Sequence, residues 1–292
     1  MTKQSEYGIG VDIGGSHITS AAINLETGEI FPESLFRMRV NSQGKAEHIL
    51  LVWTECIQAS MNTVGKENVK GLGVAMPGPF DYENGISLIN DENQKKYISL
   101  YQLNLREHLA QRLNIQPGQL FFKNDAACFL LGEVFNGAAK GTHNSIGITL
   151  GTGLGSAIMI NDDSKDAELW CSPFRNGVAE DYISTRWFLK RYYDLSGRNV
   201  ADVKELSSLI QIDKTAKLVF DEFGSALGEF LKPLVLKYNP EVIVIGGNIA
   251  NAWPLFIDPA TKEIESVSKD IKIQKAILGE EAALIGAASL LA

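Results

Sequence analysis

The feature that most constrains the fold of this chain is a glycine-rich hairpin pattern that occurs twice. In the first copy, residues 7–24, glycine alternates with apolar residues up to a turn at Gly14-Gly15, and a run rich in small, Ile and Thr residues follows. Residues 145–161 repeat the pattern, with these matches: Gly10 on Gly147, Gly14 on Gly151, Ile23 on Ile160 and Asn24 on Asn161. Each copy is typical of two strands joined by a turn. The repeat therefore predicts two similar domains that face each other.

Helical and strand patterns alternate along the rest of the chain. Apolar residues at helical spacing predict helices over residues 44–64, 105–113, 126–138, 180–193, 203–210, 213–238 and 281–291. Runs rich in β-forming residues predict strands over residues 69–75, around Phe121-Phe122 and over residues 242–245. This alternation predicts an α/β protein.

Size, charge and composition narrow the class of protein. The 292 residues, 45% of them hydrophobic, are enough for about two domains with substantial cores. The net charge of −8 and the pI near 5.2 disfavour nucleic-acid binding, which normally needs a basic surface. No apolar run approaches the roughly 20 residues of a membrane span, and the polar N-terminal segment does not resemble a signal peptide, so we expect a cytoplasmic protein without a membrane partner.

Cysteine and histidine are too sparse for a structural metal site or a disulfide framework. Cys56, Cys128 and Cys171 lie far apart in the sequence, and no histidine follows His143. Neither a Cys-x-x-Cys nor a His-x-x-x-His zinc spacing is available. We therefore expect no structural metal.

The stretch Lys123-Asn124-Asp125 lies where a predicted strand ends and a predicted helix begins. An acid at such a junction is held rigidly while its carboxylate faces a cleft, which is the placement that a general base requires. Asp125 is therefore the candidate catalytic base. The alternative is that Asp125 only caps the helix, a role that stabilises by about 1 kcal/mol.

Both hairpin turns carry groups that can bind phosphate. The turns contain Asp12, Gly14, Gly15 and Ser16 in the first copy, and Gly151, Thr152 and Gly153 in the second. Glycine lets backbone N–H groups approach a phosphate without interference from a Cβ atom, and the two hydroxyls add donors. An acid such as Asp12 fits beside bound phosphate when Mg²⁺ lies between them. The alternative is that both segments are simple tight turns.

A third glycine motif, Gly246-Gly247-Asn248, follows the strand predicted for residues 242–245. It suits a flat contact with adenine or ribose, and the alternative is a simple turn between strand and helix. Two other nucleotide motifs are excluded. The spacing of glycines over residues 151–155 resembles a dinucleotide fingerprint, but a strand-like run follows where that motif needs a helix. A P-loop sequence, Gly-x-x-x-x-Gly-Lys-Ser/Thr, does not occur.

The order of these motifs resembles that of the ROK family of sugar kinases and repressors, across essentially the full length of the chain. The shared order is a phosphate hairpin, the strand end Pro77-Gly78-Pro79, Asn-Asp, a second phosphate hairpin and a late Ile-Gly-Gly. The resemblance implies the α/β actin-like ATPase (ribonuclease H-like) fold, with two α/β domains around a central cleft. Residues 1–122 with about 280–292 would form the smaller domain and residues 123–279 the larger one. It also implies Mg-ATP as phosphoryl donor, a hexose as acceptor and commonly a homodimer.

The resemblance also implies roles for individual residues. Asp125 is similar to the catalytic base, and Asn124 to a ligand of the sugar hydroxyls, with Gly78, Glu168 and Glu180 as further sugar contacts. The nucleotide contacts would be Asp12, Gly14, Gly15, Ser16, Gly151, Thr152, Gly153, Gly246, Gly247 and Asn248, with Asp12 also near Mg²⁺. The alternative for Glu168 is a solvated surface charge. The alternative for Glu180 is an acid that the helix dipole favours at a helix N-terminus.

The interval between Glu168 and Glu180 departs from the family pattern. It is short, and it lacks both the His of the Glu-x-Gly-His signature and the Cys-x-Cys-x-x-x-x-Cys zinc loop. Its residues include Trp170, Phe174 and Arg175. We expect an aromatic and apolar plug to replace the zinc as scaffold there, so that the wall at the C1 and C2 side of the sugar changes.

The sequence thus predicts an ATP-dependent hexose kinase, with glucose phosphorylated at O6 as the first hypothesis. The changed sugar wall leaves N-acetylmannosamine, N-acetylglucosamine and fructose as alternative acceptors. A catalytically silent sugar sensor is the alternative from another class. A DNA-binding repressor is disfavoured, because only a few residues precede the first hairpin and the net charge is negative.

Overall fold

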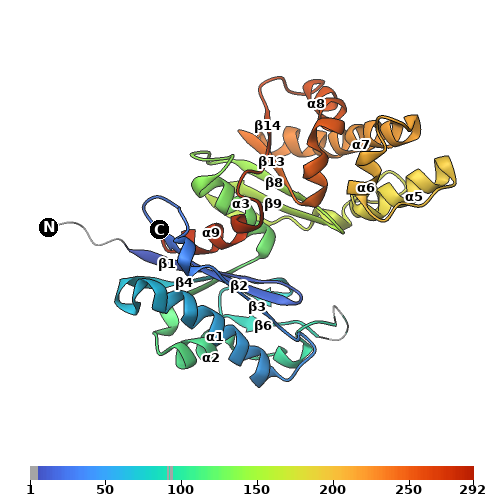
Figure 1. Cartoon of the computed structure of the whole chain (residues 1–292). Coiled ribbons are helices and arrows are strands. Elements are labelled where there is room, and N and C mark those ends of the chain that lie inside the picture. Colours follow the sequence, from blue (N-terminus) through green and yellow to red (C-terminus); the bar gives the residue numbers. More distant parts are fainter. Residues whose placement is uncertain (1–5, 91, 93–94) are drawn as a thin grey trace. The chain divides into compact units, whose positions relative to one another are not determined.

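The computed structural model describes residues 6–90, 92 and 95–292 (Figure 1). Contacts divide the chain into two compact units, and each is described by itself. Unit 1 runs to Lys140 and includes Glu280–Ala292, whereas unit 2 is Gly141–Gly279. The first junction therefore follows Lys140 and not residue 122, because helix α3 (Asp125–Asn136) packs against helix α9 (Ala282–Ser289) within unit 1.

Unit 1 is built on a five-stranded sheet with the order β3-β2-β1-β4-β7. The strands are β1 (Tyr7–Ile13), β2 (His17–Asn24), β3 (Phe36–Arg39), β4 (Val69–Ala75) and β7 (Leu120–Lys123). β1 and β2 form the antiparallel hairpin predicted from the first glycine pattern, and β4 and β7 continue the sheet parallel to β1. A small separate sheet pairs β5 (Phe80–Asp81) with β6 (Ile86–Ser87).

Helices cover both faces of this sheet, as Figure 1 shows. On one face, α1 (Ala46–Val64) and α2 (Leu105–Leu113) bury a core that includes Ile9 and Val11 of β1. The glycines that alternate with these residues lie on the opposite face of the sheet. There the backbone of α9 occupies the space where a Cβ atom at Gly10 would lie. The alternation of glycine and apolar residues in β1 thus has a packing reason: one face takes side chains and the other takes a closely approaching helix.

Unit 2 repeats the same sheet topology with the order β10-β9-β8-β13-β14. Its strands are β8 (Ser145–Leu150), β9 (Leu154–Ile160), β10 (Asp163–Asp166), β13 (Val242–Gly246) and β14 (Lys272–Lys275). Its helices are α4 (Ala179–Tyr182), α5 (Thr185–Ser196), α6 (Val203–Ser208), α7 (Lys214–Tyr238) and α8 (Ile257–Glu265), and a short hairpin pairs β11 (Pro173–Phe174) with β12 (Gly177–Val178). β8 and β9 are antiparallel and β13 is parallel to β8. The duplication predicted from the two glycine hairpins is confirmed.

The predicted elements differ from the structure mainly in one helix and at the sheet edges. The helix predicted over residues 180–193 is interrupted between α4 and α5, because the backbone N–H and the hydroxyl of Thr185 both donate to the carbonyl of Gly151 at 2.9 Å. The edge strands β3, β10 and β14, and helix α8, were not predicted. The three strands have four residues each, too few for a clear alternation.

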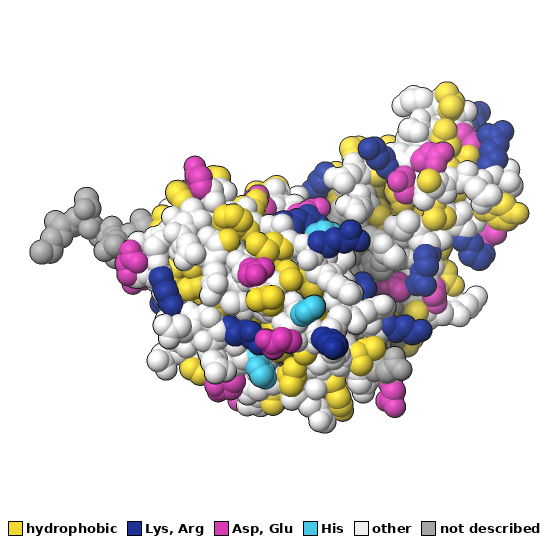
Figure 2. All heavy atoms as spheres, turned by 60° about the horizontal axis from the view of Figure 1, so that its bottom comes forward, with side chains coloured by type: hydrophobic (Ala, Val, Ile, Leu, Met, Phe, Trp, Pro, Cys, Tyr) yellow, Lys and Arg dark blue, Asp and Glu magenta, His cyan; other side chains and the backbone are white. Residues whose placement is uncertain are grey.

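The surface of the chain carries both signs of charge. On the face shown in Figure 2, acidic and basic side chains are interspersed with hydrophobic ones. Among the residues that the structure describes, none of the helices combines the length and the apolar character needed to span a bilayer.

Candidate functional site

Two acids and two loops meet at one edge of the sheet in unit 1. β1, β4 and β7 are parallel, and their register places Asp12 opposite Ala75 and Ala75 opposite Lys123. The carboxyl ends of the three strands therefore share one edge. Asp12 lies in β1 at this edge, the Pro77-Gly78 segment follows β4, and Asp125 follows β7. The carboxyl edge of parallel strands is where α/β proteins usually bind ligands.

Asn124 and Asp125 have different tasks at the start of α3. The side-chain carbonyl of Asn124 accepts hydrogen bonds from the N–H groups of Ala126 (2.8 Å) and Ala127 (3.1 Å), so Asn124 is the N-cap. Asp125 is the first helical residue, and its carboxylate accepts one bond, from Ala126 N–H at 2.9 Å. The alternative that Asp125 serves only as the helix cap is therefore wrong. Asp125 is solvent-accessible at the edge of the sheet, although the surrounding protein removes part of the water from around its carboxyl group.

The surroundings make both acids of this edge weaker than usual. Burial, and then the negative charge of Asp125, raise the pKa of Asp12 from 3.8 to about 6, although Arg37 acts in the opposite direction. Desolvation by the surrounding protein also raises the pKa of Asp125, against the effect of its hydrogen bond from Ala126. Arg37 itself is shared with Glu280 at 3.1 Å. Two carboxylates with raised pKa values side by side are typical of a site that binds a cation or moves a proton.

Tyr82 links the loop after β4 to Asn124. Its hydroxyl donates to the carbonyl of Met76 at 3.0 Å, and the side-chain amide of Asn124 donates to the Tyr82 hydroxyl at 3.5 Å. A Cβ atom at Gly78 would lie 3.4 Å from that hydroxyl, and the Gly78-Pro79 peptide bond is cis. Unit 1 thus brings Gly78, Asn124, Asp125 and Asp12 to one place. Tyr82 was missed, since no local sequence pattern marks it.

The first glycine turn is covered by a segment that comes from later in the chain. The N–H of Gly14 donates to the backbone carbonyl of His17 at 2.9 Å, and the exposed hydroxyl of Ser16 lies 2.9 Å from Nδ1 of the His17 ring. The side chain of Lys96 lies over Gly15, and the hydroxyl of Tyr97 donates to the carbonyl of Gly14 at 2.5 Å. The sequence Asn-Gln-Lys-Lys of residues 93–96 is typical of a polar loop; Asn93 and Gln94 lie outside the described residues, and Lys95 and Lys96 are exposed.

The second glycine turn, in unit 2, is held by α4 and α5. Its carbonyl at Gly151 accepts the two bonds from Thr185. The carboxylate of Glu180 accepts the N–H of Leu154 at 3.0 Å and also pairs with Arg186 at 2.7 Å. Glu180, a candidate sugar contact, therefore lies against Gly153 of this turn. Thr152 is exposed at the tip of the turn.

The third glycine motif lies beside the second turn. β13 is parallel to β8, with Gly246 opposite Thr149. Gly247 has a φ of 85°, and the backbone of Leu150 occupies the space where its Cβ atom would lie. Both the backbone conformation and the close approach require glycine there. Asn248 follows, exposed. Unit 2 thus gathers both predicted nucleotide motifs and Glu180.

The short segment between Glu168 and Glu180 is only partly the expected plug. Phe174 is buried and packs edge-on against Tyr182 and Phe230, with ring centroids 5.4 and 5.7 Å apart. Trp170, by contrast, is 48% exposed, because its short 3-10 turn directs Leu169 inward instead. Glu168 is also exposed, with a φ of 47°. The expected inclusion of Trp170 in the plug was wrong.

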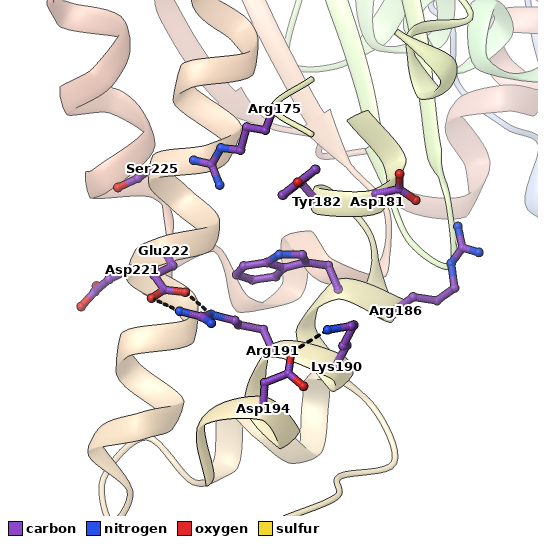
Figure 3. A pocket seen from close by; sticks show the side chains of 11 residues that line it. Arg175, Asp181, Tyr182, Arg186, Lys190, Arg191, Asp194, Asp221, Glu222 and Ser225 are labelled. Atoms are coloured by element: carbon purple, nitrogen blue, oxygen red, sulfur yellow. Dashed lines mark hydrogen bonds and ion pairs between the residues drawn. The ribbon is translucent and has the colours of Figure 1, made fainter. Parts of the chain in front are cut away.

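A separate hollow of about 920 Å³ lies between α5 and α7 in unit 2. Figure 3 shows that its charged side chains are mostly paired: Arg191 binds Glu222 through two hydrogen bonds of 2.6 and 2.8 Å, and Lys190 binds Asp194. None of the site residues predicted from the sequence lines this hollow.

Comparison with known proteins identifies the relatives of this chain. It is 27% identical to a glucokinase from Thermotoga maritima over 97% of this chain and 96% of that protein. It is 23% identical to a xylose repressor from Bacillus spizizenii over 99% of this chain and 78% of the repressor. An N-acetyl-D-glucosamine kinase from Photobacterium profundum is 24% identical over 96% of this chain and 98% of that protein.

Solved structures show the same fold. A ROK hexokinase from Thermus thermophilus matches with a TM-score of 0.78 at 22% identity, covering 97% of both chains. A ROK family glucokinase from Streptomyces griseus, solved with glucose and AMPPNP, matches with a TM-score of 0.73 at 24% identity over 97% of this chain and 98% of that one. The sequence profile of the ROK family matches residues 8–292. The chain therefore belongs to the ROK family and has its actin-like ATPase fold.

Proposed function

We propose that this protein is an ATP-dependent sugar kinase, with the primary hydroxyl of a hexose as acceptor and glucose as the first candidate. The observation that carries the proposal is the edge of the first sheet, where Asp12 and Asp125 lie beside a glycine turn with raised pKa values. The relationship to the glucokinase of Thermotoga maritima supports the choice of glucose.

In this proposal Asp125 is the general base. The attacking hydroxyl gives its proton to the Asp125 carboxylate while its oxygen forms a bond to the γ-phosphorus, and the bond from that phosphorus to the β,γ-bridging oxygen breaks. A raised pKa suits a base that takes a proton near neutral pH. Asn124 uses its carbonyl oxygen to cap α3, so its amide N–H₂ is the group that orients the sugar.

Asp12 fits the role of a Mg²⁺ ligand. Its carboxylate is partly buried beside a second acid, and Arg37, which opposes its raised pKa, also pairs with Glu280. Bound Mg²⁺ neutralises developing charge on transferred phosphate. No cluster of three or more acidic, histidine or cysteine side chains forms a metal site among the described residues. A dedicated cluster is unnecessary, because Mg²⁺ typically uses one or two carboxylates, water and substrate phosphates.

The nucleotide contacts in the proposal come from the three glycine motifs. Gly14, Gly15 and Ser16 in unit 1 would bind phosphate, as would Gly151, Thr152 and Gly153 in unit 2. Gly246, Gly247 and Asn248 would contact adenosine. The fit rests on the exposed hydroxyls of Ser16 and Thr152, and on the open space at Gly151: apart from its chain neighbours, no described residue has an atom within 4 Å of a Cβ position there.

The identity of the sugar is the least constrained part of the proposal. The carboxylate of Glu180 accepts a hydrogen bond from Leu154 and pairs with Arg186, and Glu168 is exposed. We therefore propose that the contacts to the C1 and C2 side of the sugar differ from those of the family pattern. This observation keeps N-acetylglucosamine, N-acetylmannosamine and fructose as alternative acceptors. A relative named N-acetyl-D-glucosamine kinase supports the first of them. A silent sugar sensor is the second candidate function, since a xylose repressor is also a relative.

The deciding experiment measures ADP release from Mg-ATP with a panel of sugars. The panel contains glucose, mannose, fructose, allose, N-acetylglucosamine, N-acetylmannosamine and no sugar. A strong response to one or two hexoses supports the kinase and identifies the acceptor. A flat panel, with folded protein that binds ATP, contradicts a kinase for these sugars and favours the sensor or an acceptor outside the common hexoses. The homodimer and the cytoplasmic location remain predictions, and sedimentation of the purified protein tests the former.

A further inference from the structure

Lys96 lies directly over the first glycine turn although it is remote from that turn in sequence. A Cβ atom at Gly15 would lie 2.9 Å from Cε and 3.0 Å from Cδ of Lys96, and Nζ occupies the same space. Gly15 does not have a positive φ. A side chain at position 15 would therefore displace the lysine from its place over the turn, whereas the backbone conformation does not require glycine there.

Tyr97 fixes this lysine against the turn. Its ring is fully buried and packs edge-on against Trp53 at 5.4 Å, and its N–H donates to the carbonyl of Ser42 at 2.6 Å. Its hydroxyl binds the carbonyl of Gly14. Tyr97 adopts a φ of 63°, which a tyrosine rarely takes unless its surroundings enforce it. The neighbouring Lys96 is thus positioned by a rigid anchor, while its own side chain stays exposed.

The turn beneath Lys96 has unused donors. Within the described part of the chain, the N–H groups of Gly15 and Ser16 donate to no protein acceptor, and no described carboxylate lies within 4.0 Å of the Lys96 ammonium. An ammonium beside two open backbone N–H groups and a serine hydroxyl is a favourable environment for a phosphate oxygen.

We infer that Lys96 binds the terminal phosphates of the nucleotide at the first glycine turn. This inference rests on the proposed function, and it adds a residue that lies outside the glycine motifs. Lysine acts on phosphate as a point charge, and in phosphoryl transfer such a charge stabilises the transferred group. The residue before the buried anchor thus adds a positive charge directly over the first glycine turn.

The test compares Lys96→Ala, Lys96→Arg and the matched control Lys95→Ala in the full-length protein. Lys95 is an exposed lysine of the same segment, and it lies beside Gln43 and Ser99. For Lys96→Ala we expect about a 10- to 100-fold loss in kcat/KM for ATP, with the KM for the sugar unchanged. Lys96→Arg should stay closer to the wild type, because it keeps the charge. Thermal unfolding of all three variants should match that of the wild type.

Calorimetric binding of nucleotides without sugar makes the result independent of turnover. The loss of affinity in Lys96→Ala should be greatest for ATP and should diminish through ADP to AMP, a trend that a merely structural role would not produce.

If Lys96→Ala and Lys95→Ala bind ATP equally well, the role of Lys96 is overturned, while the wild-type activity still supports the kinase. If the wild type binds ATP but phosphorylates no sugar, and Lys96→Ala still weakens ATP binding, the inference stands and the kinase fails. A wild type that does not bind ATP overturns both.

Discussion

At the scale of single residues, neighbouring polar side chains divide the work at the candidate site. Asn124 caps α3 with two hydrogen bonds, which leaves Asp125 free of that structural task. Desolvation is the largest cause of the raised pKa values of both Asp12 and Asp125, and the charge of Asp125 raises the pKa of Asp12 further. Asn124 and Asp125 are both residue types that are common at helix starts. Replacing Asn124 should lower stability, whereas replacing Asp125 should lower activity.

Asp125→Asn should separate catalysis from stability. We expect turnover to fall by roughly two to four orders of magnitude, because the proton acceptor is lost. The midpoint of urea unfolding should stay near that of the wild type, because Asn124 still caps the helix. The comparison variant Asn124→Ala removes both cap bonds and should lower the free energy of unfolding by about 1 kcal/mol. A folded Asp125→Asn protein with nearly full activity would end the proposed mechanism.

Asp12 should make the stability of the protein depend on pH. Its folded-state pKa of about 6 exceeds the ordinary value of 3.8, so between these pH values the folded state binds the proton more tightly than the unfolded state. Stability is therefore lost as the pH rises through this window, and the full penalty applies above pH 6. A rise of this size corresponds to at most roughly 3 kcal/mol, and partial exposure of Asp12 reduces it to about 1 to 2 kcal/mol.

Asp12→Asn removes this penalty. We expect its melting temperature to exceed that of the wild type at pH 8 and the difference to shrink as the pH approaches 4. Thermal unfolding of both proteins across this range is the measurement. A difference that does not change with pH would show that Asp12 titrates normally in the folded protein.

At the scale of elements, the fold of unit 1 depends on a very close contact between α3 and α9. A Cβ atom at Gly286 of α9 would lie 2.6 Å from the backbone nitrogen of Gly132 and 2.7 Å from the carbonyl carbon of Cys128, both in α3. A Cβ atom at Gly132 would in turn meet the backbone of Ala282. Backbone atoms cannot move aside as a flexible side chain can, so glycine at these positions sets the distance between the helices.

Gly286→Ala should therefore destabilise the protein by about 1 to 3 kcal/mol through overpacking. The matched control is Gly118→Ala, because its φ is not positive and, in the part of the chain that the structure describes, only its chain neighbours come within 4 Å of a Cβ position there. The control should change the free energy of unfolding by less than about 0.5 kcal/mol. Urea unfolding of both variants measures the difference, and equal values would mean that the two helices can separate at little cost.

At the scale of the whole molecule, the two units share one sheet topology but differ in how their chain is assembled. Unit 2 is continuous in sequence, and its large hydrophobic core consists entirely of residues within 141–279. Unit 1 needs the C-terminal segment, because α9 packs on β1, β4 and α3. We propose that the folding domains follow this division.

The fragment 141–279 should fold by itself. We expect a cooperative thermal transition and a mixed α/β circular dichroism spectrum, because the fragment retains its whole sheet and core. The fragment 1–140 lacks α9, which leaves the glycine-rich face of its sheet uncovered, and it should show no cooperative transition. The opposite outcome, a folded 1–140 and an unfolded 141–279, would contradict the proposed domains.

The sequence by itself determined the architecture and the family, because those depend on local and periodic patterns. The two glycine hairpins, the helical spacing over residues 44–64 and 213–238, and the order of the motifs can be recognised without knowledge of distant contacts.

Only the tertiary structure decided which neighbour caps α3, that Trp170 is exposed, and that the helix predicted from residue 180 breaks where Thr185 binds Gly151. The same holds for Lys96 over Gly15 and for Glu180 at the second turn. These contacts join residues far apart in the chain, and their existence depends on strand register and side-chain packing, which sequence periodicity does not encode.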